Sequence, residues 1–301
     1  MSFETARVMK STGSWYHVLN SKNEVVECRL RGKFRVKGIK TTNPVSVGDI
    51  IDYEQETNTI IKIHDRKNYI IRKSIKLSKQ SHIIASNIDQ AVLIVSLKQP
   101  RTSLGFIDRF LVTAEAYHIP GTIVFNKVDL LTAGDYNKLE QFIGIYEGIG
   151  YRCLKTSVKQ EINLDLFKAL FNKKISLLSG HSGVGKSALI NTINPGLGLR
   201  TGDISGYHAK GMHTTTFAEM FKLDDDSFII DSPGIKELGL VEFEKQELGH
   251  RFPEIVKYQA SCKYNNCLHV NEPSCAVKQA VEDGGINSSR YGNYLNMLES
   301  I

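Results

Sequence analysis

One stretch, from Ser179 to Ala188, constrains this chain more than any other. It contains the pattern G-x-x-x-x-G-K-S between Gly180 and Ser187. An apolar run over 175–178 precedes it and predicts a buried strand, and a helical pattern follows it. A phosphate-binding loop needs this strand–loop–helix context, because its glycines let successive N–H groups point at phosphate oxygens. The stretch therefore predicts that the protein binds a nucleoside triphosphate.

Individual residues of this loop have expected roles. Lys186 should reach the β- and γ-phosphates, and it lies at a helix N-terminus, whose partial positive charge attracts anions. Ser187 offers a hydroxyl to Mg²⁺. The residues expected around the phosphates are Gly180, His181, Ser182, Gly183, Val184, Gly185, Lys186, Ser187 and Ala188.

The chain of 301 residues carries a net charge of +6, which is unevenly distributed. Its first 80 residues contain 16 Lys and Arg against 8 Asp and Glu, whereas the remainder is slightly acidic. Such a basic segment is typical of a module that contacts a polyanion. A merely solvated basic surface would give the same counts, so charge alone leaves both interpretations open.

The sequence has no sign of a membrane or secreted protein. No apolar run reaches the length of a membrane span, and residues 1–20 lack an apolar signal core. Three of the five cysteines crowd into a short C-terminal stretch, which disfavours a disulfide framework. We therefore expect a cytoplasmic protein without membrane contacts, and a monomer.

Residues 1–74 predict a small antiparallel barrel, because short β-branched and aromatic runs alternate there with turn residues. Compact size and a basic face favour an oligonucleotide-binding (OB) barrel that contacts RNA. Trp15, Tyr16 and Phe34 are candidates to stack on bases, although each is also typical of a core. Basic residues that alternate along one segment are expected on one strand face as RNA contacts: Arg29, Arg31, Lys33, Arg35 and Lys37.

Residues 75–240 predict a central α/β domain with a parallel sheet. The basic, aperiodic stretch over 68–86 is expected to be a linker. Beyond it, apolar runs alternate with amphipathic helical patterns, as in βαβ units. In such sheets ligands bind at the carboxyl ends of the strands, so motifs that follow strands are the candidates for a site.

An N-K-V-D motif, formed by Asn126, Lys127, Val128 and Asp129, follows one of these predicted strands. The Asp129 carboxylate can accept hydrogen bonds from the N1–H and 2-amino groups of guanine, and adenine has neither donor. Asn126 can bond to the purine edge, and the stem of Lys127 can lie along the base. Together with the phosphate-binding loop, the motif predicts GTP and GDP as ligands. After the next strand, a base-supporting loop is expected at Thr156, Ser157 and Val158.

Two segments beyond the phosphate-binding loop complete a predicted magnesium site. Residues 202–216 are rich in glycine and threonine, as is typical of a loop ordered by γ-phosphate and Mg²⁺. Thr215, with Thr214 as the alternative, is expected to complete the metal shell beside Ser187. A D-x-x-G motif begins at Asp231, which would hold Mg²⁺ through water, and its Gly234 N–H would touch the γ-phosphate.

The order of these motifs differs from that of an ordinary GTPase, in which the N-K-x-D comes after the phosphate-binding loop. Here it comes first, which predicts a circularly permuted domain. It also places the D-x-x-G beside the C-terminal module, so we expect nucleotide state to be relayed there. Ile235 cannot orient the attacking water as glutamine does in Ras-like proteins, so intrinsic hydrolysis should be slow. The catalytic candidates are Lys186, Thr215 and His213. For His213, the alternative of an ordinary surface histidine is equally open.

Residues 241–301 contain a candidate metal centre and helical patterns around 276–281 and 291–298. Three thiolates and one imidazole would form a closed tetrahedral site for one structural Zn²⁺. So small a domain needs such a staple, because it can bury little core. The alternative is three reduced cysteines and a chance histidine. The expected ligands of this mostly helical domain are Cys262, Cys267, His269 and Cys275.

Taken together, the chain resembles the circularly permuted ribosome-biogenesis GTPases of the RsgA/YjeQ type over nearly its whole length. The resemblance implies a factor that binds the small (30S) ribosomal subunit and its 16S rRNA late in maturation. It implies GTP hydrolysis to GDP and phosphate mainly on the subunit, with His213 taking part, and Ile235 agrees with the family pattern. The motifs that carry it are 126–129, 180–187, 210–216, 231–234 and the Cys/His set.

Two other functions fit the same motifs. One is a GTP-gated RNA-binding switch whose turnover is incidental, and the other is a translation or tRNA-related GTPase that acts on another RNA. Strong activation by small subunits, and not by free RNA, would favour the ribosome-biogenesis GTPase over both of these alternatives.

Overall fold

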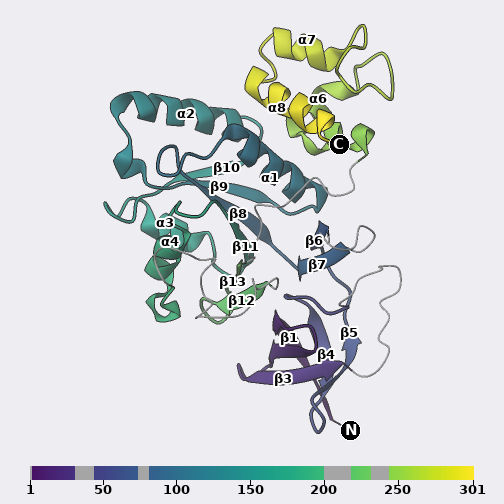
Figure 1. The fold of residues 1–301 in the computed structure, drawn as a ribbon, viewed down its shortest axis with the longest axis vertical. Coiled ribbons are helices and arrows are strands. Elements are labelled where there is room, and N and C mark those ends of the chain that lie inside the picture. Colours follow the sequence, from purple (N-terminus) through teal and green to yellow (C-terminus); the bar gives the residue numbers. More distant parts are fainter. Residues whose placement is uncertain (1, 31–43, 74–80, 200–217, 232–243) are drawn as a thin grey trace.

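The computed structural model describes residues 2–30, 44–73, 81–199, 218–231 and 244–301. Three parts follow one another along its long axis: an N-terminal barrel, a central sheet with helices, and a C-terminal helical module (Figure 1). Within these ranges, no helix has both the length and the apolar character needed to cross a bilayer. The domain boundaries predicted near 74 and 240 fall outside the described residues and stay predictions.

The first five strands close a small barrel. β1 (Phe3–Ser11) pairs with both β2 (Trp15–Leu19) and β4 (Ile50–Glu54). β3 (Val25–Leu30) pairs with β2 and, in parallel, with β5 (Thr59–Ile63), which returns to β4. This order, 1-2-3-5-4-1, is the topology of an OB barrel, so the predicted fold is confirmed.

The two aromatic residues at the start of β2 point to opposite faces, because successive strand residues alternate. Tyr16 is 1% exposed and lies in the barrel core with Val8, Val18 and Ile51, as its alternative interpretation predicted. Trp15 is 45% exposed. Phe34, the third stacking candidate, lies outside the described residues.

The central domain is built on six strands in the order β10-β9-β8-β11-β13-β12. All neighbouring pairs are parallel except β12, which runs antiparallel to β13. This arrangement confirms the predicted parallel α/β sheet. Its strands are β8 (Gln90–Val95), β9 (Gly121–Phe125), β10 (Arg152–Lys155), β11 (Ile175–Ser179), β12 (Glu219–Lys222) and β13 (Phe228–Asp231).

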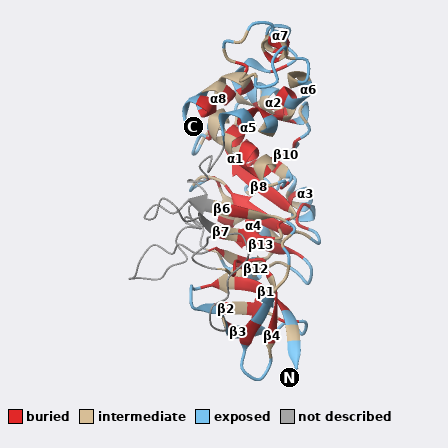
Figure 2. Ribbon diagram, turned by 90° about the vertical axis from the view of Figure 1, so that its right-hand side faces the viewer, coloured by how far each residue is buried: buried red, intermediate tan, exposed pale blue. Residues whose placement is uncertain are grey.

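Helices cover both faces of this sheet, and alternate residues of β8 supply both cores. α1 (Leu104–Ala116) and α2 (Ala133–Glu147) pack on one face with Leu93. α3 (Leu164–Ala169) and α4 (Lys186–Ile193) pack on the other with Ile94. Buried residues accordingly concentrate along the strands in Figure 2. The 3₁₀ turns η1 (Val128–Leu130) and η2 (Pro195–Leu197) follow β9 and α4.

The stretch predicted as a linker contains a second, two-stranded sheet. β6 (Tyr69–Lys73) pairs antiparallel with β7 (Ser81–Ser86). Ile70 and Ala85 are buried in the same core as α1. The linker prediction is therefore wrong for these residues, because isolated apolar positions in a basic segment find a tertiary partner that periodicity does not reveal.

The barrel and the central sheet are continuous. β1 pairs antiparallel with β12, with Lys10 opposite Glu219, so that all these strands form one eleven-stranded sheet.

The C-terminal module is helical, as predicted, with its own buried cluster around Phe252 and Tyr294. Val112 of α1 also belongs to this cluster. The sequence patterns indicated α7 and α8 but missed α6, which is short and begins at Pro253. The elements are α5 (Lys245–Leu248), η5 (Gly249–Arg251), α6 (Pro253–Gln259), α7 (Ala276–Glu282) and α8 (Ser288–Glu299).

Candidate functional site

The predicted motifs meet at one edge of the central sheet, where its parallel strands have their carboxyl ends. The phosphate-binding loop follows β11, the N-K-V-D follows β9, Ser157 follows β10, and Asp231 ends β13. Because neighbouring parallel strands end at the same edge, residues as far apart in the sequence as Asn126 and Asp231 come together there.

The backbone of the phosphate-binding loop demands glycine at two points of close approach. Gly180 has φ +144° and Gly185 has φ +96°. A Cβ at Gly180 would overlap the carbonyl oxygen of Ile94, and one at Gly185 would overlap the side-chain amide of Asn126. The loop is therefore pressed against both β8 and the N-K-V-D.

Lys186 begins α4, and its ammonium group lies inside the loop. Its Nζ donates to the carbonyl oxygens of Gly180 at 2.6 Å and of His181 at 2.8 Å. The first-turn hydroxyl of Ser187 is buried beside it. The lysine charge is thus already placed where phosphate oxygens would enter.

The N-K-V-D motif ties the loop to β9. Asn126 Nδ2 donates to the carbonyl oxygen of Val184 at 2.8 Å, and its Oδ1 accepts from Thr156 Oγ1 at 3.0 Å. Lys127 Nζ donates to the carbonyl oxygens of Gly183 and Gln99, both at 2.6 Å. The predicted contacts of the Asn126 side chain and the Lys127 stem to the base stay predictions, and in the structure the polar groups of both side chains position the loop.

Asp129 is oriented by the loop after β10. Ser157 Oγ donates to Asp129 Oδ1 at 2.6 Å, and it accepts from the Gln160 N–H at 3.1 Å. Ser157 is fully buried, which fixes the direction of its hydroxyl. The result is a carboxylate held at the sheet edge, with the chemistry needed to accept two donors from guanine.

Asp231 lies among charged groups. Burial raises its pKa to about 6, with the Lys186 charge opposing and the Glu219 charge adding to that rise. A divalent cation here would favour the ionised carboxylate. The predicted site residues that lie outside the described part of the chain are Arg31, Lys33, Arg35, Lys37, His213, Thr214, Thr215 and Gly234.

The four predicted zinc ligands converge in the C-terminal module: one ligand atom from each lies within 4.8 Å of the others. Cys262 Sγ lies 3.8 Å from Cys275 Sγ, and His269 Nδ1 lies 3.6 Å and 3.4 Å from these two sulfurs. Tetrahedral bonds of about 2.3 Å to sulfur and about 2.0 Å to nitrogen give separations of about 3.5–3.8 Å. These four side chains therefore fit one Zn²⁺.

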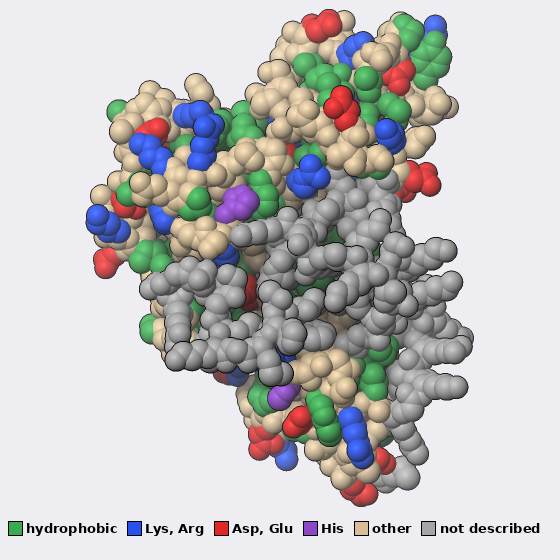
Figure 3. All heavy atoms as spheres, in the orientation of Figure 1, with side chains coloured by type: hydrophobic (Ala, Val, Ile, Leu, Met, Phe, Trp, Pro, Cys, Tyr) green, Lys and Arg blue, Asp and Glu red, His purple; other side chains and the backbone are tan. Residues whose placement is uncertain are grey.

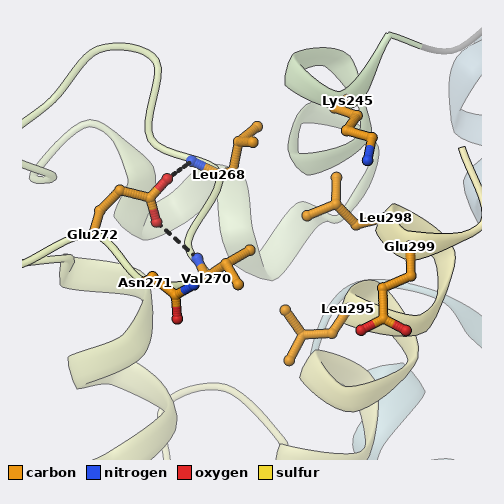
Figure 4. Close-up of a pocket in the computed structure, with 8 residues that line it drawn as sticks. All are labelled: Lys245, Leu268, Val270, Asn271, Glu272, Leu295, Leu298 and Glu299. Atoms are coloured by element: carbon orange, nitrogen blue, oxygen red, sulfur yellow. Dashed lines mark hydrogen bonds between the residues drawn. The ribbon is translucent and has the colours of Figure 1, made fainter.

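The loop from Cys267 to Cys275, called the zinc-ligand loop below, is held by a carboxylate that no sequence pattern predicted. Glu272 accepts from the N–H groups of Leu268 at 2.7 Å and Val270 at 2.8 Å, on either side of His269 (Figure 4). Burial alone would raise the pKa of Glu272, but these N–H groups outweigh it and lower the pKa. Tyr291 OH also donates to the His269 carbonyl oxygen at 2.6 Å.

Beside this loop is a hollow of about 610 Å³ on the C-terminal module. Figure 4 shows apolar side chains from the zinc-ligand loop and from α8 around it. It is remote in the fold from the sheet edge that carries the nucleotide motifs. Its lining residues are Lys245, Leu268, Val270, Asn271, Glu272, Leu295, Leu298 and Glu299.

Gln99 was also missed as part of the nucleotide site, whereas Thr156 was predicted there in the base-supporting loop. Gln99 contributes only its carbonyl oxygen to the contact with Lys127. The Glu272 carboxylate accepts from the backbone N–H groups of Leu268 and Val270. Neither contact leaves a local sequence pattern.

The fold and the site define a P-loop GTPase whose motifs run in circularly permuted order. Residues 63–241 match the RsgA GTPase family model, and residues 5–61 match the model of the RsgA N-terminal domain. The chain belongs to the RsgA GTPase family.

Curated relatives match nearly the whole chain. Small ribosomal subunit biogenesis GTPase RsgA 2 of Bacteroides thetaiotaomicron is 55% identical, over 97% of this chain and 95% of its own. The Flavobacterium johnsoniae protein named small ribosomal subunit biogenesis GTPase RsgA is 52% identical, over 98% and 93%.

Two solved structures are similar. YjeQ from Thermotoga maritima is 34% identical with a TM-score of 0.81, over 99% of this chain and 98% of its own. YloQ, described as a circularly permuted GTPase, is 31% identical with a TM-score of 0.75, over 100% and 95%.

Proposed function

We propose that this chain is a GTPase that binds the small (30S) ribosomal subunit, assists its late maturation, and hydrolyses GTP to GDP and phosphate when the subunit stimulates it. One observation carries the proposal: relatives named for small-subunit biogenesis share about half of all residues across nearly the full length. The oriented Asp129 at the sheet edge supports guanine as the base.

In this proposal GTP lies along the sheet edge. Asp129 accepts from the guanine N1–H and 2-amino groups, and Ser157 keeps its carboxylate in place. The N–H groups of the loop over 180–188 hold the phosphates together with Lys186, and the Gly234 N–H touches the γ-phosphate.

Mg²⁺ belongs with the nucleotide, and it would neutralise charge that develops on the phosphates. Ser187, Thr215 and, through water, Asp231 would hold it. His213 positions the attacking water in this scheme, because Ile235 has no group that can do so. Replacing His213 should therefore lower stimulated hydrolysis more than nucleotide affinity.

The C-terminal set of Cys262, Cys267, His269 and Cys275 holds one structural Zn²⁺ in this proposal. The observed spacing of the ligand atoms supports it. Burial raises the pKa of the Cys267 thiol to about 12, so a cation is needed to stabilise its thiolate form.

The barrel contacts 16S rRNA in this proposal. Trp15 and Arg29 are both exposed and lie opposite each other on β2 and β3, so a base can stack beside a cation that reaches a phosphate. On the face shown in Figure 3, Lys and Arg are interspersed with acidic groups over the upper part of the molecule and over the described part of the barrel. The excess of Lys and Arg over Asp and Glu in the first 80 residues supports the barrel as the principal RNA contact. A cytoplasmic monomer fits this role.

The test is phosphate release from GTP and from ATP, with and without purified small subunits. We expect slow turnover of GTP alone, a sharp rise with subunits, and no turnover of ATP. An Asp129→Asn variant serves as the matched control, because it should lose activity with GTP and gain it with xanthosine triphosphate, whose 2-oxo group replaces the amino donor.

Equal turnover with and without subunits would overturn the ribosomal role. Little turnover under any condition would favour the GTP-gated RNA-binding switch, and stimulation by free RNA would favour a GTPase acting on another RNA.

A further inference from the structure

Helix α1 lies between the C-terminal module and the sheet edge that carries the phosphate-binding loop (Figure 1). Side chains from its first two turns contact both. The helix begins where the Ser103 hydroxyl caps the N–H of Phe106 at 3.2 Å. This cap fixes the residue at which the helix begins, and it therefore fixes where the side chains of the first two turns lie.

Toward the C-terminal module, α1 presents a buried carboxylate. Asp108 accepts from Arg290 Nη1 at 2.7 Å and from Asn293 Nδ2 at 2.5 Å, both on α8. Gly105 lies against the same Asn293 side chain, because a Cβ there would be 3.4 Å from its Oδ1. The start of α1 is thus closely packed against α8.

Arg290 is fixed in turn. It donates to Glu254 Oε1 at 2.7 Å and to Oε2 at 3.1 Å, and its guanidinium lies 4.7 Å from the Phe252 ring centroid. A bidentate guanidinium clamped over an aromatic ring has little freedom to move. Asp108 therefore has a rigid partner.

Toward the phosphate-binding loop, α1 presents an aromatic ring. Phe106 stacks on His181 with ring centroids 4.0 Å apart and an interplanar angle of 31°. Phe106 and Asp108 are two positions apart, so they point in different directions from the helix. His181 is also the residue whose carbonyl oxygen accepts from Lys186 Nζ.

We propose that Phe106 is a positioning residue for the phosphate-binding loop, and that α1 thereby couples the C-terminal zinc module to nucleotide binding. The ring stack holds His181, and His181 holds the lysine that meets the phosphates. Docking of α8 on Asp108 and Gly105 sets where that ring lies. The inference rests on the proposed function only in that this site binds GTP and GDP.

Reciprocity follows from thermodynamic linkage. If the seating of α8 changes nucleotide affinity, then bound nucleotide changes the seating of α8 by the same factor. A partner that contacts the C-terminal module would in this way alter nucleotide release without reaching the nucleotide.

The experiment measures release of a fluorescent GDP from the full-length, zinc-loaded protein. Phe106→Leu keeps an apolar side chain but removes the stacking ring, and should speed release about three- to ten-fold. Phe110→Leu is the matched control, because Phe110 lies one turn further along α1 in the sheet core and should leave release unchanged. Equal effects of both variants would overturn the positioning role.

A second variant tests the coupling. Asn293 is on α8 and is no part of the phosphate-binding loop or of the nucleotide site. Asn293→Ala should nevertheless speed GDP release from the otherwise wild-type protein, and it should cause no further increase in the Phe106→Leu variant. No change, or fully additive effects, would overturn the coupling. Asn293→Leu, of similar volume, repeats the test if the alanine variant is not folded by circular dichroism. Failure of the unaltered protein to bind GDP would instead overturn the proposed function.

Discussion

The central domain meets its two neighbours through junctions of different chemistry. Toward the barrel, β1 pairs with β12, and the Lys10–Glu219 ion pair at 3.0 Å has both side chains about one-third exposed. Toward the C-terminal module, Arg290 joins Asp108 and Glu254 in a triad that is almost wholly buried.

This difference predicts how each junction responds to change. An exposed ion pair contributes about 0–1 kcal/mol, because water screens it. A buried charge that loses its partner costs about 3–5 kcal/mol, because nothing else compensates it. The barrel junction therefore combines the pairing of β1 and β12 with the burial of Met9 and Val47 in the central core, whereas the other junction contains one buried guanidinium.

Zinc removal should have the largest effect, and this effect should be confined to the C-terminal module. Stripping the ion with a strong chelator should unfold α6, α7 and α8, because the module has too little core to stand alone. Hydrogen exchange read by peptide should show lost protection over 253–299 and retained protection in the barrel strands. Unchanged protection over 253–299 would contradict the structural role.

Arg290→Met should lower the free energy of unfolding by about 3–5 kcal/mol, because it leaves Asp108 and Glu254 buried without their cation. Urea denaturation measures this loss. Arg152→Met, at an exposed arginine, is the control and should change little. A loss below about 1 kcal/mol would mean that water reaches the triad and that the two junctions are alike.

Arg7→Met tests the partly buried side of the barrel junction. The Arg7 guanidinium lies 5.6 Å from the Phe228 ring centroid, and burial lowers its pKa while Asp89 opposes that fall. Loss of this stack should cost about 1–2 kcal/mol in the same denaturation assay. A cost as large as that of Arg290→Met would show that this junction also depends on a single charge.

Lys10→Met should have the smallest effect, below about 1 kcal/mol, and the effect should shrink further at high salt. Denaturation at low and high ionic strength measures it, with Glu219→Gln as the companion variant. A salt-independent loss of several kcal/mol would reverse the comparison.

Much of the fold and of the candidate site was predictable because the signals are local. The glycines around Lys186, the carboxylate of Asp129 after a strand, and the tight spacing of Cys262 to Cys275 each have their meaning within a few residues. The structure brings the described members of these sets together where expected. The β6–β7 sheet was missed because its apolar positions are few and lie in a basic segment.

The long-range contacts had no such signal. Arg290 and Asp108 are 182 positions apart, and Lys10 and Glu219 are 209 apart. Each alone is an ordinary charged residue on a strand or helix. Asn126 and Lys127 were assigned to the base from their motif, while their contacts to the phosphate-binding loop depend on how β9 lies beside β11.

The chemistry available to this protein follows from its amino-acid sequence alone: a loop for phosphates, a carboxylate for guanine, thiols for a metal, and the permuted order of its motifs. These depend on residue type and short spacing, which the chain carries directly. The three-dimensional fold is needed to show which charges are buried, that the barrel and sheet are continuous, and that α1 contacts both the zinc module and the phosphate-binding loop. Burial and proximity arise from packing, where partners far apart in the chain exclude water from each other.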